Sequence, residues 1–287
     1  MEHHPRIGVI GGSGLYQMDN LENIEVHEVS TPYGNPSSPI IIGDLKGKRV
    51  AFLARHGIGH VIAPTQVNYR ANIYALKSLG VKYIISVSAV GSLREDYAPG
   101  DLVVPDQLFD FTKDRKRTFF DKDLVAHVDV AEPFCPNLSK IAFNAINRTK
   151  ANVHRGGSLI TIEGPRFSTK SESNTFRIWG MSIIGMTTSP EAFLAREAEM
   201  CYTVMAHVSD YDVWHISKEP VTVEQVIKVL NQNVHIAQEA VKNLIADIDD
   251  HAYCEHQASL KTALISSLGA VSKETLDELA IFVKKYF

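Results

Sequence analysis

The sequence lacks the features of a membrane protein, a secreted protein or a nucleic-acid-binding protein. No apolar run approaches the length needed to span a bilayer. Glycines interrupt the apolar run near the start of the chain, so it has neither the core nor the cleavage site of a signal peptide. The 29 basic and 33 acidic residues leave a net charge of −4, which offers no basic surface for nucleic acid. We therefore expect a cytoplasmic protein that binds neither membrane nor nucleic acid.

Cysteine is scarce as well. The three cysteines, Cys135, Cys201 and Cys254, are an odd number without the spacing of a metal site. Buried free thiols are the expected state in a reducing compartment, and a Cys135–Cys201 disulfide is the less favoured alternative. The cysteine spacing therefore predicts no metal centre.

The chain also lacks a complete nucleotide-binding motif, although its start suggests one. An apolar run at 7–10 leads into the turn Gly11–Gly14, as a strand leads into a phosphate-binding loop. A dinucleotide-binding fold would need a third glycine where Gln17 stands and then a helix, but a strand-like alternating stretch soon follows. The glycine-lysine loop of nucleoside triphosphatases is missing from the sequence. What remains is a glycine turn carrying the hydroxyl of Ser13, either a plain turn or an anion contact.

What is present is an alternation of strand-like and helix-like segments, in a composition of 45% hydrophobic and 22% charged residues typical of a globular protein. No composition break marks a linker. The pattern predicts a single α/β domain over 1–287, with a mixed central sheet flanked by helices and a C-terminal helical segment from about 251. The main predicted strands are 48–57, 83–92, 158–165, 182–189 and 201–210, and the predicted helices are 66–80, 169–180, 190–200, 222–248 and 273–287.

One segment, 107–136, does not follow this alternation. It is charged, aromatic and aperiodic, and loops of that length are usually functional or disordered. Its aromatic residues, Phe109, Phe111, Phe119 and Phe120, are too many for a disordered segment. We expect the segment to be an irregular loop that packs against something, with a neighbouring subunit as one candidate.

Polar residues gather where the predicted strands end. Ligands of open α/β sheets bind beyond the carboxyl ends of the strands. The strand ends here carry Ser13, Arg55 with His56, Ser88 with Ala89, and Thr187. An arginine fork with several hydroxyls suits a small oxyanion, and a free phosphate fits better than one attached to a nucleotide. Each residue alone is equally compatible with an ordinary turn, so the prediction depends on their convergence.

A second group, in the stretch SDYDVW, ends another apolar strand. Asp210 and Asp212 are two residues apart and so lie on one side of an extended chain. Solvated turn carboxylates are the simpler interpretation. The functional interpretation is a pair in which one protonated carboxyl donates to a ring nitrogen and the other accepts from an exocyclic amino group. That pattern suits adenine and penalises a 6-oxopurine.

With these residues in place, the chain resembles the trimeric purine nucleoside phosphorylase family, in particular its methylthioadenosine-cleaving members. The resemblance extends from Ile7 to about Ile248. The stretches that carry it are IGGSGL, TPYGNPS, LARHG, VNYRANIYALK, SAVGSLRE, PGD, AEPFCP, TIEGPRFST, MTTSPE, AREAEMCY and SDYDVW. It implies that the phosphate of the first glycine turn is inorganic and is itself the attacking reagent.

The resemblance also implies a role for individual residues. It places phosphate against Ser13, Arg55, His56, Ser88, Ala89 and Thr187, where serine replaces the threonine of many relatives at 13 and 88. Met186 would contact the ribose, and Phe167, Ser168, Asp210, Tyr211 and Asp212 the base. Val223, Val226 and Ile227 would line an apolar pocket for the 5′ group, which His127 of a neighbouring subunit would complete.

The implied reaction is phosphorolysis of 5′-methylthioadenosine to adenine and 5-methylthioribose 1-phosphate, in purine and methionine salvage, with some cleavage of adenosine. The resemblance implies a homotrimer or a dimer of trimers, and no metal or organic cofactor. Three alternatives stay open from the residues: a phosphorylase for 6-oxopurine nucleosides or methylthioinosine, a hydrolase that uses water, and a non-catalytic nucleotide-binding protein.

Overall fold

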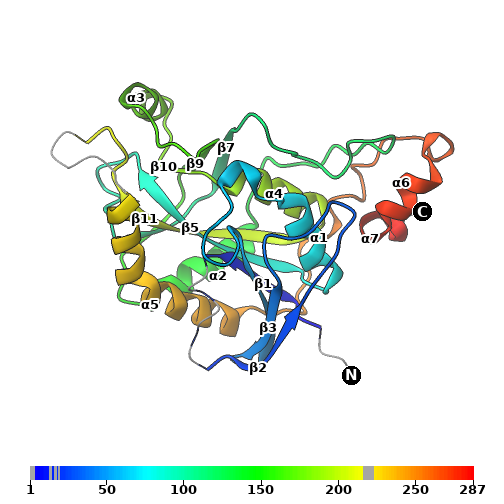
Figure 1. The fold of residues 1–287 in the computed structure, drawn as a ribbon, viewed down its shortest axis with the longest axis horizontal. Helices are drawn as coiled ribbons and strands as arrows, with labels where there is room; N and C mark the ends of the chain where they lie inside the picture. Colours follow the sequence, from blue (N-terminus) through cyan, green and yellow to red (C-terminus); the bar gives the residue numbers. More distant parts are fainter. Residues whose placement is uncertain (1–3, 13–14, 16–17, 19, 216–222) are drawn as a thin grey trace.

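The computed structural model describes residues 4–12, 15, 18, 20–215 and 223–287, apart from the side chains of 223–233 and 268 (Figure 1). Within this part of the chain a single mixed sheet of eleven strands is flanked by helices. The predicted α/β class with a mixed central sheet is confirmed.

The sheet branches at its longest central strand, β5. Along one path its order is β2-β3-β4-β1-β5-β10-β9-β7, while β11 also pairs with β5 and continues to β6 and β8. Strands β4, β1, β5 and β11 run parallel, so their carboxyl ends meet at one edge. The bounds are β1 Ile7–Gly11, β2 Glu22–His27, β3 Ile40–Leu45, β4 Lys48–Ala54, β5 Tyr83–Ser92, β6 Leu102–Val104, β7 Gln107–Phe111, β8 Val153–Arg155, β9 Ser158–Ile162, β10 Ile183–Gly185 and β11 Cys201–Asp210.

The helices cover both faces of the sheet (Figure 1). Helices α1 and α4 contact each other on one face, and α2 and α5 pack together on the other. The bounds are α1 Tyr69–Ser78, α2 Pro136–Ile146, α3 Lys170–Ile178, α4 Thr188–Glu197, α5 Val223–Asp247, α6 Lys273–Glu278 and α7 Ala280–Val283. Short 3₁₀ turns are η1 Pro64–Gln66, η2 Glu255–Ala258, η3 Leu268–Ala270 and η4 Lys284–Tyr286.

Alternate residues of β11 explain why the sheet has an apolar core on each side. Val204 and Ala206 point into the cluster under α1 and α4, whereas Met205 points into the cluster under α2 and α5. A strand covered on both faces reads as a continuous apolar run, which is the pattern of Cys201–Asp210.

The prediction of an irregular loop over 107–136 is wrong at its start. Residues 107–111 form β7, an edge strand parallel to β9, with alternate residues exposed. Further on, Phe119 and Phe120 are buried in the chain's own core, and the ring of Phe119 lies 4.5 Å from that of Phe282 near the C-terminus. These two aromatics therefore pack within the chain and not against a neighbouring subunit.

The three cysteines are free and buried, as the sequence predicts. The less favoured Cys135–Cys201 disulfide is not formed. The nearest sulfur to Cys135 in a hydrogen-bonding contact is that of Cys254, at 3.4 Å.

Candidate active site

The turn after β1 and the end of β4 lie side by side at the carboxyl edge of the sheet. The backbone amide of Arg55 donates to the carbonyl of Gly11, at 3.0 Å. This contact brings Arg55 next to the glycine turn. Ser13, the predicted hydroxyl of that turn, lies outside the described residues.

Arg55 is a buried, fixed cation. Its Nε and Nη2 donate to the two carboxylate oxygens of Glu191, at 2.7 and 2.9 Å, and Nη1 donates to the carbonyl of Val87. Burial disfavours the charged guanidinium, but the Glu191 carboxylate outweighs this and raises the pKa of Arg55. The second hydrogen on Nη1 has no protein partner in the described part of the chain, so one N–H remains for an anion.

His56 is a neutral hydrogen-bond acceptor in this setting. Its Nδ1–H donates to the carbonyl of Ile62, at 2.9 Å. Burial, and then the charge of Arg55, lower the pKa of His56 to about 4. At neutral pH the Nε2 atom therefore carries a lone pair, which accepts a hydrogen bond from a P–OH group.

Two of the predicted hydroxyls meet beside the middle of β5, so the prediction that Ser88 and Ala89 end a strand is wrong. Ser88 Oγ, near the middle of β5, lies 3.4 Å from Thr187 Oγ1 after β10. Ala89 follows on β5 and pairs in register with His207. Since the Arg55 guanidinium contacts Val87, the arginine, Ser88 and Thr187 form one polar group at the sheet edge.

The two aspartates form a second buried polar group. Asp210 accepts hydrogen bonds on both oxygens, from the Asp212 amide at 2.7 Å and from Ser209 Oγ at 2.5 Å. Asp212 is 9% exposed and has a left-handed backbone (φ 51°), which is uncommon outside glycine. Its Oδ2 has no hydrogen-bond partner in the described residues.

The electrostatics of the pair favour retention of a proton. Burial raises the pKa of Asp210. Burial, and then the charge of Asp210, raise the pKa of Asp212. Two buried carboxyls in contact titrate as a unit, so the pair as a whole is a proton donor at a higher pH than an exposed aspartate.

Residues of β5 link the two polar groups. Gly91 pairs in register with Asp210, and a Cβ on Gly91 would lie 3.0 Å from Asp210 Oδ1 and 3.3 Å from Asp212 Cβ. Glycine is thus required for the aspartates to approach the strand. Ser88 and Gly91 are three residues apart, about 10 Å in a strand. The two polar groups are therefore about that far apart along one strand.

Two serines beside Asp212 also lack partners. The hydroxyls of Ser168, predicted from the sequence, and Ser173, which sequence reasoning missed, lie next to Asp212. Both are buried without a hydrogen-bond partner in the described residues, like Asp212 Oδ2. The two hydroxyls lie close enough to Asp212 to favour its charged form, although neither forms a well-aligned hydrogen bond with it, and all three groups keep bonding capacity for a polar ligand. Phe167, at 36% exposure, precedes Ser168.

Sequence reasoning also missed Arg115, which organises this edge. Its guanidinium donates to the carbonyls of Met186, at 2.8 Å, and Ser189, at 2.6 Å, and to Glu163 Oε1 at 3.1 Å. Hydrogen bonds, the first from the Lys113 amide, outweigh desolvation and lower the pKa of Glu163 to about 2, so the partner of Arg115 is ionised. Met186, the predicted ribose contact, is thereby fixed by the segment 112–136.

The structure shows fewer contacts for the remaining predicted residues. Tyr211 is half-buried between the aspartates, and its ring stacks on His215 at 4.7 Å. Val223, Val226 and Ile227 lie in the first turns of α5, with side chains outside the described residues. His127 is exposed, and its amide donates to the carbonyl of Ala263 at 2.9 Å.

Comparison with known proteins identifies the family of the chain. Residues 6–246 match the phosphorylase superfamily. The chain is 52% identical to S-methyl-5′-thioadenosine phosphorylase of Chloroflexus aurantiacus, with 99% of each chain covered. A crystal structure of a methylthioadenosine phosphorylase from an antarctic soil metagenomic library superposes with a TM-score of 0.93 at 45% identity, covering 98% of this chain and 99% of that one.

The chain belongs to the S-methyl-5′-thioadenosine phosphorylase family. A further member of the family, methylthioadenosine phosphorylase from Schistosoma mansoni in complex with adenine, has a TM-score of 0.84 at 36% identity, covering 90% of this chain and 98% of that one. A family member is an enzyme, so the non-catalytic alternative is wrong. In the described residues, no helix is both long and apolar enough to cross a bilayer.

Proposed function

We propose that the two polar groups of this phosphorylase bind inorganic phosphate and adenine, and that the enzyme cleaves 5′-methylthioadenosine between them. The observation that carries the proposal is the set of buried atoms without partners at Asp212, Ser168 and Ser173, about one pentose away from Ser88. An adenine edge offers both donors and an acceptor to these atoms.

Phosphate binds at Arg55, His56, Ser88 and Thr187, with Ser13 and the amide of Ala89 completing the contacts. Glu191 neutralises part of the Arg55 charge, so the site holds the anion without binding it irreversibly. The neutral His56 accepts a hydrogen bond from a P–OH group of phosphate, while Arg55 and the hydroxyls donate hydrogen bonds to its other oxygens. This arrangement of a cation, hydroxyl donors and one acceptor suits a phosphate monoanion or dianion. A water molecule would not need so many donors, which argues against a nucleosidase.

The reaction exchanges one bond at the sugar for another. The bond between C1′ and N9 of adenine breaks, and the ribosyl carbon takes on oxocarbenium character. The aspartate pair donates a proton to N7, so that adenine leaves as a neutral base. The phosphate, held beside C1′, stabilises the developing charge and forms the new C1′–O bond.

The choice of base follows from the same pair. A carboxylate that accepts from the 6-amino group of adenine would face the 6-oxo group of inosine, an acceptor against an acceptor. A site built to bond a substrate NH discriminates strongly against an analogue without it. The alternative of a phosphorylase for 6-oxopurines or methylthioinosine is therefore disfavoured.

The 5′ group is recognised by Val223, Val226 and Ile227 and by His127 of a second subunit. The exposure of His127, on a strand-like segment fixed to Ala263, supports this role. A methyl-sized difference in an apolar pocket is worth only about 1–3 kcal/mol, so adenosine is also cleaved. The assembly is a trimer or a dimer of trimers, and a monomer in sedimentation equilibrium would contradict it.

Asparagine substitutions test the acid role directly. We expect Asp210→Asn and Asp212→Asn each to lower kcat for methylthioadenosine by at least about a hundredfold, the scale of general acid catalysis. Asp277→Asn, at an exposed position on α6, is the control and keeps full activity. Full activity in both site variants would overturn the role of the pair.

A further inference from the structure

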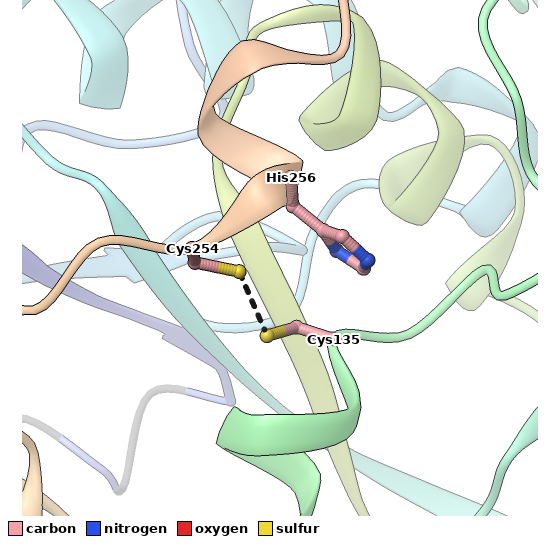
Figure 2. A group of neighbouring side chains, drawn as sticks. All are labelled: Cys135, Cys254 and His256. Carbon is pink, nitrogen blue, oxygen red and sulfur yellow. Dashed lines mark hydrogen bonds between the residues drawn. The ribbon is translucent and has the colours of Figure 1, made fainter.

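A second cluster of reactive side chains lies at the opposite end of β11 from the aspartates. Cys135 precedes α2, and Cys254 and His256 belong to the segment around η2 (Figure 2). Cys201 begins β11. Cys201 and Asp210 are the first and last of the 10 residues of β11, about 30 Å apart in an extended strand. The phosphorolysis chemistry therefore does not use this cluster.

The donor atoms of the cluster already lie close together. The sulfurs of Cys135 and Cys254 are 3.4 Å apart. These two sulfurs and an imidazole nitrogen of His256 all lie within 4.8 Å of one another. Tetrahedral zinc, with bonds of about 2.3 Å to sulfur, places its sulfur ligands about 3.7 Å apart. A shift of a few tenths of an ångström would bring the two sulfurs to that spacing.

A third thiol borders the other two. Cys201 interacts with both Cys135 and Cys254, and Gln257 Nε2 donates to its sulfur at 3.7 Å. Cys135, Cys254 and His256 are the three donors that already lie together, and Cys201 borders them as a fourth thiol that would complete the Cys₃His set of a zinc site.

The charge around the cluster suits such a site. Three thiolates and one Zn²⁺ carry a net charge of −1, and Arg196 supplies a positive charge beside them. Its Nη2 donates to His256 Nε2 at 2.9 Å, and its Nη1 to the carbonyl of Asp129 at 2.8 Å. Because Nε2 accepts this bond, Nδ1 carries the proton that a metal at Nδ1 would displace.

We propose that Cys135, Cys254 and His256, with Cys201 as the fourth donor, bind a thiophilic metal ion, for which Zn²⁺ is the probe. The ion would join the C-terminal segment to α2 and to the start of β11. A Cys135–Cys254 disulfide would use two of these side chains and would leave His256 and Cys201 without a role.

The full-length protein, stripped of metal and reduced with a non-chelating phosphine, is titrated with Co²⁺ and then with Zn²⁺. We expect one Co²⁺ per chain, a sulfur-to-cobalt charge-transfer absorption and its loss when Zn²⁺ displaces Co²⁺. A hundredfold excess of Zn²⁺ over Kd is expected to raise Tm by about 5 °C. The rate of phosphorolysis should not change, because the aspartates are about 30 Å away.

Two variants and a control make the test specific. Cys254→Ser and His256→Ala should each weaken Co²⁺ binding at least about tenfold. Since His256 is only half-buried, its variant keeps the test valid if Cys254→Ser fails to fold. His235→Ala, at an exposed position of α5, should bind as the parent does. Absence of the charge-transfer band, equal binding by both variants, or isolation of a Cys135–Cys254 disulfide that takes up no metal would overturn the proposal.

Discussion

At the scale of residues, the site depends on side chains that touch no substrate. Glu191 is wholly buried and accepts from Arg55 and from the hydroxyl of Tyr202, at 2.7 Å. Without this carboxylate the buried guanidinium would keep its bond to Ser86 Oγ, at 2.6 Å, but would lose the two bonds that fix its orientation. Glu191 therefore positions Arg55 in the proposed phosphate site.

Replacing Glu191 tests this positioning. We expect Glu191→Gln to raise KM for phosphate about 10–100-fold, the value of one hydrogen bond to a charged group, with a much smaller change in KM for the nucleoside. The measurement is steady-state kinetics with each substrate varied in turn. Glu278→Gln, in a pair with Lys122 on the surface, is the control. An equal rise in both KM values would indicate general damage in place of positioning.

At the scale of elements, the segment 112–136 is fixed to the sheet by buried charges. Arg115 joins its start to β9 and β10, and the carboxylate of Glu197, at the end of α4, accepts from Thr118 Oγ1 at 2.7 Å and from the Phe119 amide at 2.8 Å. Burial raises the pKa of Glu197 to about 7 in spite of these bonds. The anchoring of the segment is therefore sensitive to pH.

The sign of the pH effect follows from proton binding. Between about pH 4.5 and 7 the folded chain holds a proton on Glu197 that the unfolded chain has lost, so the free energy of unfolding falls as pH rises through this window. The loss amounts to about 3 kcal/mol. We expect Glu197→Gln to flatten urea-unfolding stability against pH over that window, while the exposed Glu255→Gln does not. Parallel curves for Glu197→Gln and the parent would contradict this.

The sequence predicts elements best where one pattern decides them. The alternation of apolar and small residues in 83–92 and 201–210 predicts β5 and β11 to the residue, and Thr169 with Glu172 forms the capping box that starts α3. The strand β7 was not predicted, because an edge strand with exposed aromatics lacks a buried face. Helix α2 was not predicted either, because it begins at Pro136 inside the segment interpreted as a loop.

Some site residues can likewise be predicted from the sequence pattern, and others cannot. Side chains that follow parallel strands, such as Arg55 after β4 and Asp212 after β11, can be predicted from the sequence because topology brings the ends of parallel strands together. Glu191 and Arg115 are not visible, because each acts through a partner more than seventy positions away or on another element. The cysteine cluster was not predicted for the same reason. Its three cysteines are 53 or more positions apart, and only Cys254 and His256 are close in the sequence.

At the scale of the whole molecule, the branched sheet brings residues from several distant segments together around β5. Strand β5 pairs with β1 over its first residues, with β11 over most of its length and with β10 at its end, so Ser88 and Gly91, which lie beside the proposed phosphate and base contacts, are on one strand. The C-terminal segment closes over 118–134 through Phe282 and through the bridge between Ala126 and Leu264. The surface that carries His127 is thus built from residues 118–134 together with the C-terminal segment that packs on them.

The central claim is that free phosphate, and not water, attacks an adenine nucleoside in this site. The most direct measurement is release of adenine from 5′-methylthioadenosine with and without phosphate, beside hypoxanthine release from inosine. We predict release that requires phosphate, with little cleavage of inosine. Release of adenine without phosphate would contradict the account of Arg55, His56 and Ser88, and faster cleavage of inosine would contradict the account of Asp210 and Asp212.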